Sequence, residues 1–318
     1  MKLVAALVFA LAPAFAPAQE YPARPVRFVS PYPPGGVVDI AARLVGAKLS
    51  ELWGQQIVVE NRVGGGGTLA ADHVARSPAD GYTYLFGTVS DFCITPHTYS
   101  KLAYDIRRDF APVLVATETP IMLAAHGGAP FASLQELIAH SKTLKAGLSY
   151  SSPGLGTLNH LTGERLALDT GANLVHVPYK GGGPAGTAVA AGEVPFGVLA
   201  ASSAAPHIKS GRVKAIAVAT RGRIALGPDW PTVIESGVPE FTASQWVGVA
   251  IPAGTPRAVI EKANRDINRV LAMPEVRERL NGVGSEPAGG TAQEMAERMR
   301  TESAQFARIV QRIKLKLD

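Results

Sequence analysis

The chain has 318 residues with 31 Lys+Arg against 26 Asp+Glu, so its net charge of +5 is modest, and no run of five basic residues points to nucleic acid. A hydrophobic fraction of 47% with 18% charged residues supports a packed core and argues against a disordered chain. The only cysteine, Cys93, excludes an intramolecular disulfide, a zinc finger and a cysteine-ligated iron–sulfur cluster.

The first residues have the pattern of a secretory signal peptide. Lys2 precedes an apolar run over residues 3–12, and Ala16-Pro17-Ala18 follows with the Ala-x-Ala pattern of a cleavage site. The apolar run is too short to cross a bilayer, which takes about 20 residues. We therefore expect residues 1–18 to be removed after Ala18 and the rest of the chain to be exported to a bacterial periplasm. The alternative is a buried N-terminal helix.

After this segment, short apolar runs alternate with turns and helical patterns. The clearest helix follows a turn at 31–36 and carries on one face Ala41, Leu44, Val45, Leu49 and Leu52. Strands are predicted at 25–30, 57–59, 83–86, 113–116, 121–125, 148–151, 174–177, 194–199 and 213–218. Further helices are predicted from 68, from 133, at 158–168 and 185–191, around 206–209, from 256 to about 272, and from 291 onward.

This order of strand, turn and helix is typical of an α/β fold with mainly parallel sheets. At about 100–200 residues per domain, the length allows two such units. The helical C-terminal stretch needs a sheet built earlier to pack on, so we expect the chain to cross to a second lobe near 118–124 and to return near 244–248. The predicted organisation is one lobe from 19–121 and 247–318, and a second lobe from 122–246.

Four glycine-rich turns follow predicted strands and lead into predicted helices, at 31–36, 64–67, 151–157 and 179–183. Ligands of open α/β sheets bind beyond the carboxyl ends of the strands. Glycine lets the backbone approach a ligand, and the free N–H groups at a helix start favour anions. The sequence therefore predicts anion cradles built from backbone and hydroxyl groups. The alternative is that these turns only connect strands to helices.

Motifs for catalysis and for cofactors are weak. The sequence has no Gly-x-Ser-x-Gly nucleophile elbow, no P-loop and no complete dinucleotide fingerprint. The seven histidines lack His-x-x-x-His and His-x-x-Glu-His spacing, so no metal, cofactor or catalytic residue is predicted. Cys93 has no adjacent histidine and is interpreted as an inert small residue, and Trp246 as a packing residue at the second crossing.

A few polar residues near the turns receive structural interpretations. Asp39, at the start of the first long helix, suits a capping role, with Arg43 as a partner for a carboxylate. His160 follows the 151–157 turn and is expected to pack or to support that turn rather than act as a base. His176 occupies an inward or edge position on its strand. Lys180, at a strand end, either pairs with a ligand carboxylate or is solvated.

Nine short motifs run in order through nearly the whole mature chain. The first is Pro33-Pro34-Gly35-Gly36-x-x-Asp39-Ile40-x-Ala42-Arg43. The others are Val59-Glu60-Asn61-Arg62 with Gly65–Gly67, Asp80-Gly81-Tyr82-Thr83, Tyr150-Ser151-Ser152-Pro153-Gly154-Leu155-Gly156-Thr157, His176-Val177-Pro178-Tyr179-Lys180-Gly181, Pro206-His207-Ile208-Lys209-Ser210-Gly211, Pro231-Thr232-Val233-x-Glu235-x-Gly237, Trp246-x-Gly248 and Pro252-Ala253-Gly254-Thr255-Pro256. Together they resemble the Bug/TctC-type extracytoplasmic solute receptors, the binding components of tripartite tricarboxylate transport systems.

The resemblance implies a two-lobed, type II-like periplasmic-binding-protein fold with a hinge. It implies a monomeric receptor that passes a small organic carboxylate to membrane transporter subunits, without cofactor, metal or catalysis. The family grips the carboxylate with one loop from each lobe, largely through backbone N–H groups and bridging water; by motif these loops are 32–37 and 151–157. The expected ligand contacts are Tyr32, Pro33, Pro34, Gly35, Gly36, Val37, Thr88, Ser90, Ser151, Ser152, Gly154, Leu155, Gly156, Thr157, Tyr179 and Lys180.

The chain departs from the family pattern in two places. Val37-Val38 replaces the more usual Pro-Thr, which removes a hydroxyl and favours a less polar ligand, such as an aromatic or aliphatic carboxylate. Pro195 stands where an acidic residue is common. Two other functions stay open: an exported hydrolase that uses Ser151 or Ser152 with His160, and a module that presents its ligand to a sensor protein.

Overall fold

The structure is a computed structural model that describes residues 21–317, so the predicted signal peptide and its cleavage site lie outside the described residues. The strands are β1 (Val26–Ser30), β2 (Ile57–Asn61), β3 (Thr83–Thr88), β4 (Phe110–His126), β5 (Leu148–Ser152), β6 (Leu174–Pro178), β7 (Phe196–Ala200), β8 (Val213–Val218), β9 (Ser244–Pro252) and β10 (Glu286–Gly289). The helices are α1 (Val37–Trp53), α2 (Thr68–Ala75), α3 (Thr95–Thr98), α4 (Leu134–Thr143), α5 (Leu158–Thr170), α6 (Gly182–Ala191), α7 (Ala201–Lys209), α8 (Arg257–Leu271), α9 (Pro274–Gly282) and α10 (Ala292–Ile313), with short turns η1 (Gly65–Gly67) and η2 (Ser90–Ile94). Within residues 21–317, no helix combines the length and the apolar character that a membrane span needs.

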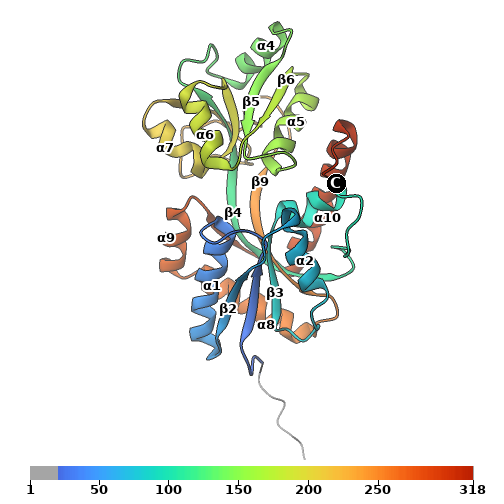
Figure 1. Cartoon of the computed structure of the whole chain (residues 1–318). Coiled ribbons are helices and arrows are strands. Elements are labelled where there is room, and N and C mark those ends of the chain that lie inside the picture. Colours follow the sequence, from blue (N-terminus) through green and yellow to red (C-terminus); the bar gives the residue numbers. More distant parts are fainter. Residues whose placement is uncertain (1–20, 318) are drawn as a thin grey trace, which may run out of the picture.

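Figure 1 shows two lobes joined by β4 and β9, which confirms the predicted two-lobed α/β fold. The first lobe contains β1, β2, β3 and β9, and the second contains β5 to β8. In β1, Phe28 faces the core shared with α1 and α8, whereas the next residue, Val29, faces the core that contains α2 and α10. Both faces of the strand are therefore buried here, which explains why two apolar residues stand next to each other in its sequence.

One predicted pair of strands is wrong. The runs at 113–116 and 121–125 belong to a single strand, β4, which continues through Glu118 and Pro120. Residues 110–120 pair with β9 in the first lobe, and residues 121–126 pair with β7 and β8 in the second. Pro120 stands where the pairing partners change, a place in a strand that tolerates proline. The chain therefore crosses between the lobes as a continuous strand rather than through a loop.

The strand directions bring the loops of the two lobes toward one another. β1 is parallel to β2 and β3, and β9 is antiparallel to both β3 and β4, so β1 to β3 run with β4 toward the second lobe. β7 is antiparallel to β4, and β5 is parallel to β6 and β7, so these three strands run back toward the first lobe. The carboxyl ends of both sets of strands therefore face the junction between the lobes.

Helix α10 fastens the crossing strands to the core. Trp246 of β9 is fully buried, stacks on Phe92 with ring centroids 5.5 Å apart, and donates its indole N–H to Glu302 of α10 at 2.8 Å. Arg298, one turn earlier on α10, pairs with both Glu302 and Glu118 of β4. The packing role predicted for Trp246 is confirmed.

Cys93 lies in η2 and is fully buried, with its Sγ 3.7 Å from the carbonyl oxygen of Met299. Burial raises the pKa of its thiol well above the ordinary value, so the thiolate is disfavoured. This environment agrees with the interpretation of Cys93 as an inert small residue.

Candidate ligand-binding site

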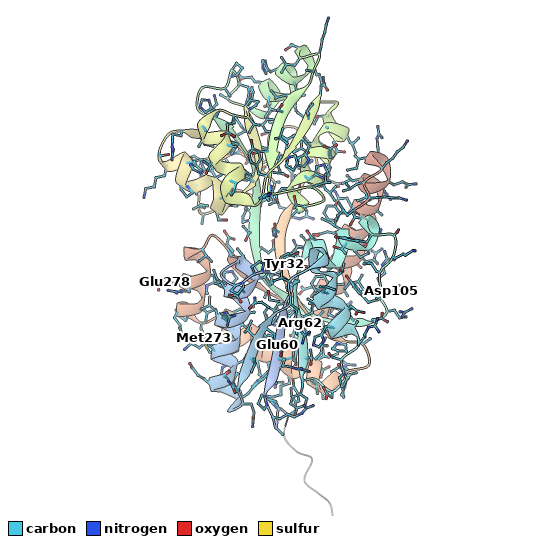
Figure 2. The ribbon with its side chains drawn as sticks, in the orientation of Figure 1. Tyr32, Glu60, Arg62, Asp105, Met273 and Glu278 are labelled. Atoms are coloured by element: carbon cyan, nitrogen blue, oxygen red, sulfur yellow. The ribbon has the colours of Figure 1, made fainter. Side chains whose placement is uncertain are left out.

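Two sets of loops face each other across the junction of the lobes. The loops after β1, β2 and β3 belong to the first lobe, and those after β5 and β6 belong to the second. Figure 2 places Tyr32, in the first of these loops, at the edge of the first lobe that faces the second. The four glycine-rich turns predicted from the sequence all fall at these positions, at 31–36, 64–67, 151–157 and 179–183.

The loop after β1 is held from inside by a carboxylate. Asp39, which is 3% exposed, accepts the backbone N–H of Gly35 at 2.9 Å. Arg43 and Asn61 also donate to Asp39, and Asn61 donates to the carbonyl oxygen of Tyr32 at 2.9 Å as well. Burial alone would raise the pKa of Asp39, but the hydrogen bonds from Arg43, Gly35 and Asn61 outweigh it and hold this pKa below its ordinary value. The interpretation of Asp39 with Arg43 as its partner is confirmed.

A second carboxylate, Asp91, lies beneath the same loop. Its Oδ2 accepts from the Thr88 N–H at 2.6 Å and from the Tyr32 hydroxyl at 3.0 Å, and Tyr32 also contacts the Thr88 hydroxyl at 2.9 Å. Its Oδ1 has no hydrogen-bond partner among residues 21–317 and lies against Gly67. Burial raises the pKa of Asp91 to about 6, although the hydrogen bonds from Thr88 and Tyr32 lower it. Thr88 is thus buried beside Asp91, whereas Ser90 is half-buried at the start of η2.

The tip of this loop is open to solvent. Pro33, Pro34, Gly35 and Gly36 are exposed, and Val37, the first residue of α1, is half-buried. Gly36 has extended backbone angles at the N-cap of α1, with no side chain to accept the free N–H groups of the first turn. The loop therefore offers exposed backbone at a helix start, and the hydroxyl that the family pattern would supply there is absent.

In the second lobe, the loop after β5 is held by a serine and a histidine. Ser152 Oγ lies 2.6 Å from Nε2 of His176 and accepts the backbone N–H of Gly154 at 3.1 Å. The hydrolase alternative pairs Ser151 or Ser152 with His160, but in the structure Ser152 contacts His176 and Ser151 donates to a carbonyl of α6. Both serines are fully buried. Neither hydroxyl is therefore placed to attack a substrate.

His160 supports the other end of that loop. Its Nδ1 accepts the backbone N–H of Gly156 at 3.2 Å, and Thr157 caps α5 by accepting the His160 N–H at 3.3 Å. Thr157 also donates to the carbonyl oxygen of Gly154 at 2.8 Å. Leu155, between the two glycines, is 53% exposed. The predicted supporting role of His160 is confirmed, and the loop presents Leu155 outward while its glycine N–H groups point inward.

The two histidines form a stacked pair. Their ring centroids are 3.9 Å apart with an interplanar angle of 24°. Burial, together with His176, lowers the pKa of His160 to about 3, and burial lowers the pKa of His176 to about 4. Both imidazoles are therefore neutral near pH 7. The sequence pattern did not reveal this pair, because the two residues lie on α5 and β6 and meet only through the β5–β6 register.

The loop after β6 lies beside the loop after β5. Gly181 donates its N–H to the carbonyl oxygen of Pro153 at 2.9 Å. The Tyr179 hydroxyl donates to Glu193, which follows the end of α6, at 3.3 Å. Lys180 is exposed and forms no ion pair with any residue from 21 to 317. Lys180 is thus a solvated cation within the loop after β6.

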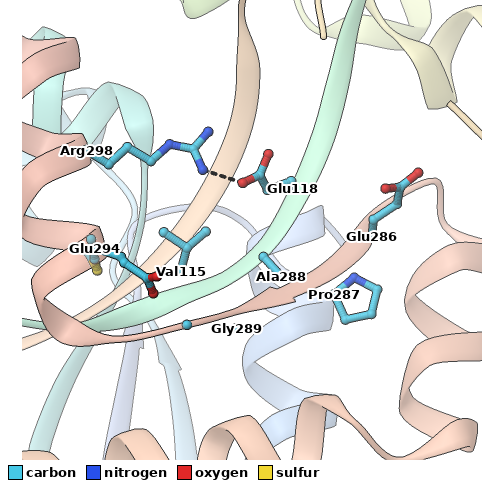
Figure 3. Close-up of a pocket in the computed structure, with 10 residues that line it drawn as sticks. Val115, Glu118, Glu286, Pro287, Ala288, Gly289, Glu294 and Arg298 are labelled. Atoms are coloured by element: carbon cyan, nitrogen blue, oxygen red, sulfur yellow. Dashed lines mark hydrogen bonds and ion pairs between the residues drawn. The ribbon is translucent and has the colours of Figure 1, made fainter. Parts of the chain in front are cut away.

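Two cavities lie along the crossing strands. One of about 920 Å³ is lined by residues of both crossing strands, of α10 and of the segment after β8, with Leu158 of α5 at its edge. Figure 3 shows a neighbouring pocket around the ion pair between Glu118 and Arg298. The predicted ligand contacts do not line these two cavities. They lie instead on two separate lobes, facing one another.

Comparison with known proteins gives a consistent family. A family model described as the tripartite tricarboxylate transporter family receptor matches residues 41–315. A relative is the UPF0065 protein from the tcbD-tcbE intergenic region of Pseudomonas sp. strain P51. It is 36% identical over 291 residues, which cover 91% of this chain and 86% of the relative.

Two solved structures share the fold at similar identity. R. palustris Rpa4515 with adipate is 33% identical, with a TM-score of 0.79 over 92% of this chain and 98% of that one. MatC (Rpa3494) from Rhodopseudomonas palustris with bound malate is 32% identical, with a TM-score of 0.76 over 91% of this chain and 100% of that one.

Proposed function

The chain belongs to the tripartite tricarboxylate transporter receptor family, and we propose that it is a periplasmic receptor that binds a small organic carboxylate between its lobes and delivers it to a membrane transporter. Receptors of this family are periplasmic. Export would follow from the N-terminal segment, with cleavage after Ala18. We further propose that the protein acts as a monomer, with lobes formed by 19–121 and 247–318 and by 122–246.

One observation carries the proposal. The loops that precede α1 and α5 face each other from two lobes. Each loop leads into a helix whose N-terminus lies at the junction of the lobes. Free N–H groups and the helix dipole favour an anion at such a position. Two carboxylates, adipate and malate, are bound by the similar proteins described above.

We propose that the ligand contacts come from both loops. In the first lobe they are the exposed tip at 33–36 with Tyr32 and Val37, and in the second lobe they are 151–157 with Tyr179 and Lys180. The apolar Val37 at the mouth of the first loop favours an aliphatic or aromatic acid over a strongly polar one. A ligand that touches both lobes binds the closed arrangement more tightly and shifts the protein toward it.

We propose no catalytic role for this site. The 2.6 Å contact between Ser152 and His176 has the spacing of a nucleophile and its base, but Ser152 is fully buried. Its oxygen already accepts the Gly154 N–H. A module that presents the ligand to a sensor would use the same loops and differ only in its partner.

A thermal-shift screen of residues 19–318 tests the proposal. The panel contains adipate, malate, other mono-, di- and tricarboxylates, aromatic acids, amino acids and sugars. A ligand that binds only the native state raises the melting temperature in proportion to the logarithm of its excess over Kd. We expect a rise with one or more carboxylates and none with sugars. No rise with any acid, together with no small acid released from the denatured protein, would contradict the proposal.

A further inference from the structure

We propose that His160 and His176 act as a neutral imidazole pair that holds the 153–157 loop in its ligand-binding shape: His160 accepts a hydrogen bond from the loop, and His176 acts through its contact with Ser152. This inference rests on the proposed function, because the loop matters only if it receives the carboxylate. The two histidines are then positioning residues: they touch the loop and not the ligand.

One hydrogen bond fixes the position of the proton on His160. The Gly156 N–H donates to Nδ1 of His160 at 3.2 Å, so Nδ1 carries no proton and the imidazole proton is on Nε2. Ser152 Oγ lies 2.6 Å from His176 Nε2, accepts the Gly154 N–H at 3.1 Å and can donate to the Gly154 carbonyl oxygen at 3.1 Å. The first histidine therefore holds Gly156 directly, and the second holds Gly154 through Ser152.

The 153–157 loop has a backbone conformation that few residues adopt. Gly156 has φ +74°, in the left-handed region that favours glycine. With both glycine N–H groups turned inward, three donors near the loop keep no acceptor among the residues from 21 to 317: the N–H groups of Leu155 and of the first two residues of α5, Leu158 and Asn159. A carboxylate is the natural acceptor for these donors.

The surroundings of the pair favour its neutral form. The rings stack at 3.9 Å, so two imidazolium ions there would repel each other at close range. Tyr150 packs against His176 at 5.1 Å and donates its hydroxyl to Glu164 at 2.9 Å, and Glu164 lies 3.8 Å from His160 Nε2. His160 is 5% exposed. Glu164 is the charged group that faces the pair, and its carboxylate by itself favours a proton on His160. Burial outweighs it, and the pKa values of both rings are low.

Replacing one acceptor at a time tests this arrangement. Asparagine at 160 places an amide oxygen near the position of Nδ1, so H160N keeps an acceptor for Gly156. Glutamine at 176 places an amide near Nε2 that can accept from Ser152 or donate to it, so H176Q keeps a hydrogen-bond partner for Ser152. H160L and H176L keep apolar bulk, but H160L loses the acceptor for Gly156 and H176L loses the hydrogen-bond partner of Ser152. A lost acceptor leaves a loop donor unpaired, whereas a kept acceptor preserves the loop.

The decisive measurement is isothermal titration of adipate and malate into wild type and the four variants, with the melting temperature of each recorded. We expect H160L and H176L to weaken binding by about tenfold or more, and H160N and H176Q to stay within about threefold of wild type. Wild-type affinity in a folded leucine variant would overturn the inference. If a leucine variant fails to fold, a tenfold loss in the matching amide variant overturns it.

A second readout needs no ligand. Nitrogen-15 NMR of the imidazoles from pH 8 to pH 5 is expected to show both rings neutral throughout and His160 protonated on Nε2. A ring that titrates near pH 6.5, or a His160 proton on Nδ1, would overturn the inference and leave the proposed function standing. If wild type binds neither acid and no other acid in the panel, the proposed function fails, and with it the positioning role, whatever the NMR shows.

Discussion

The loops of the two lobes are held by different kinds of hydrogen-bond acceptor: charged carboxylates in the first lobe and neutral groups in the second. In the first lobe, Asp39 accepts the Gly35 N–H and Asp91 accepts the Thr88 N–H, so two carboxylates hold the backbone. In the second lobe, the same task falls to His160 and to Ser152. Both solutions satisfy inward N–H groups, but one brings negative charge near the proposed anion site and the other brings none. Inward N–H groups can therefore be satisfied, and the loop shape fixed, with or without a charged group near the proposed site.

The carboxylates of the first lobe are not equivalent. Asp39 is paired with Arg43, whereas Asp91 has no cationic partner among the described residues. Its pKa of about 6 means that part of its charge is removed in mildly acidic solution. The second lobe needs no such compensation because its acceptors are neutral at pH 7. We therefore expect the second loop to be the more favourable docking point for a carboxylate at neutral pH.

The largest change in stability is expected from a substitution at Gly67, which lies against Asp91 in the first lobe. Gly67 has φ +103°, and a Cβ there would come within 1.9 Å of Asp91 Oδ1. We expect Gly67→Ala to lower the free energy of unfolding by about 3 kcal/mol, from backbone strain and displacement of the buried carboxylate. Urea denaturation at pH 7 measures the loss.

The matched control is Gly36→Ala in the neighbouring loop. Gly36 has φ −76°, and a Cβ there would lie 3.6 Å from the Pro33 oxygen, an ordinary contact. We expect a change within about 1 kcal/mol. Equal losses at the two glycines would mean that Asp91 does not fix the loop.

The stability of the protein should depend on pH in opposite directions for the two lobes. Because the folded pKa of Asp91, about 6, lies above its ordinary 3.8, the folded protein favours the protonated form. Its contribution to stability is present below pH 3.8 and is lost as the pH rises through 6. The histidines have lowered folded pKa values, so their contribution is present above pH 6.5 and is lost as the pH falls toward 4.

Asp91→Asn removes one of these opposing slopes. Relative to wild type, the variant is expected to gain about 2–3 kcal/mol of stability between pH 4 and pH 7. The histidine contribution is common to both proteins and cancels in the difference. Urea denaturation of both proteins at several pH values gives the result. A difference that does not change with pH would show that Asp91 titrates near its ordinary value.

A smaller loss is expected from Asp39→Ala. The substitution leaves the Gly35 N–H and the Asn61 amide without their acceptor, and it should lower the free energy of unfolding by about 2 kcal/mol at pH 7. Because the pKa of Asp39 is below its ordinary value, the loss should shrink as the pH falls below about 4. Asp72→Ala, which removes an exposed pair with Arg76, is the control and should cost less than about 1 kcal/mol.

Much of the fold was predictable because strands buried on both faces carry apolar residues at consecutive positions, as at Phe28-Val29 in β1 and Tyr84-Leu85-Phe86 in β3. The single strand β4 was not, because Pro120 interrupts its pattern, and only the change of pairing partners explains why the strand continues. β9 was not predicted as a strand either; its residues were assigned only to the second crossing.

The candidate loops were predictable, but the side chains that hold them were not. Glycine-rich turns mark the loops in the sequence. Asp91 reaches Tyr32 from 59 residues away, and His176 reaches Ser152 from 24 residues away. The register that sets Tyr150 opposite His176 decides the second contact, and a single sequence does not contain it. Asp91 was missed in the sequence; the signal that could have found it is an acidic residue between Ser90 and Phe92, three residues after the end of β3.

The smallest effect on ligand affinity is expected from Lys180, the exposed cation of the second lobe's loops. If the second loop binds its anion through backbone N–H groups, the exposed Lys180 adds only a screened attraction, and Lys180→Ala should weaken adipate binding by less than about threefold. Lys142→Ala is the control, because Lys142 donates to Thr170 at the opposite end of α5. Titration calorimetry at low and high salt measures both variants. A tenfold loss for Lys180 that vanishes at high salt would make this lysine the charge partner of the ligand, and the second lobe would then match the first in using a formal charge.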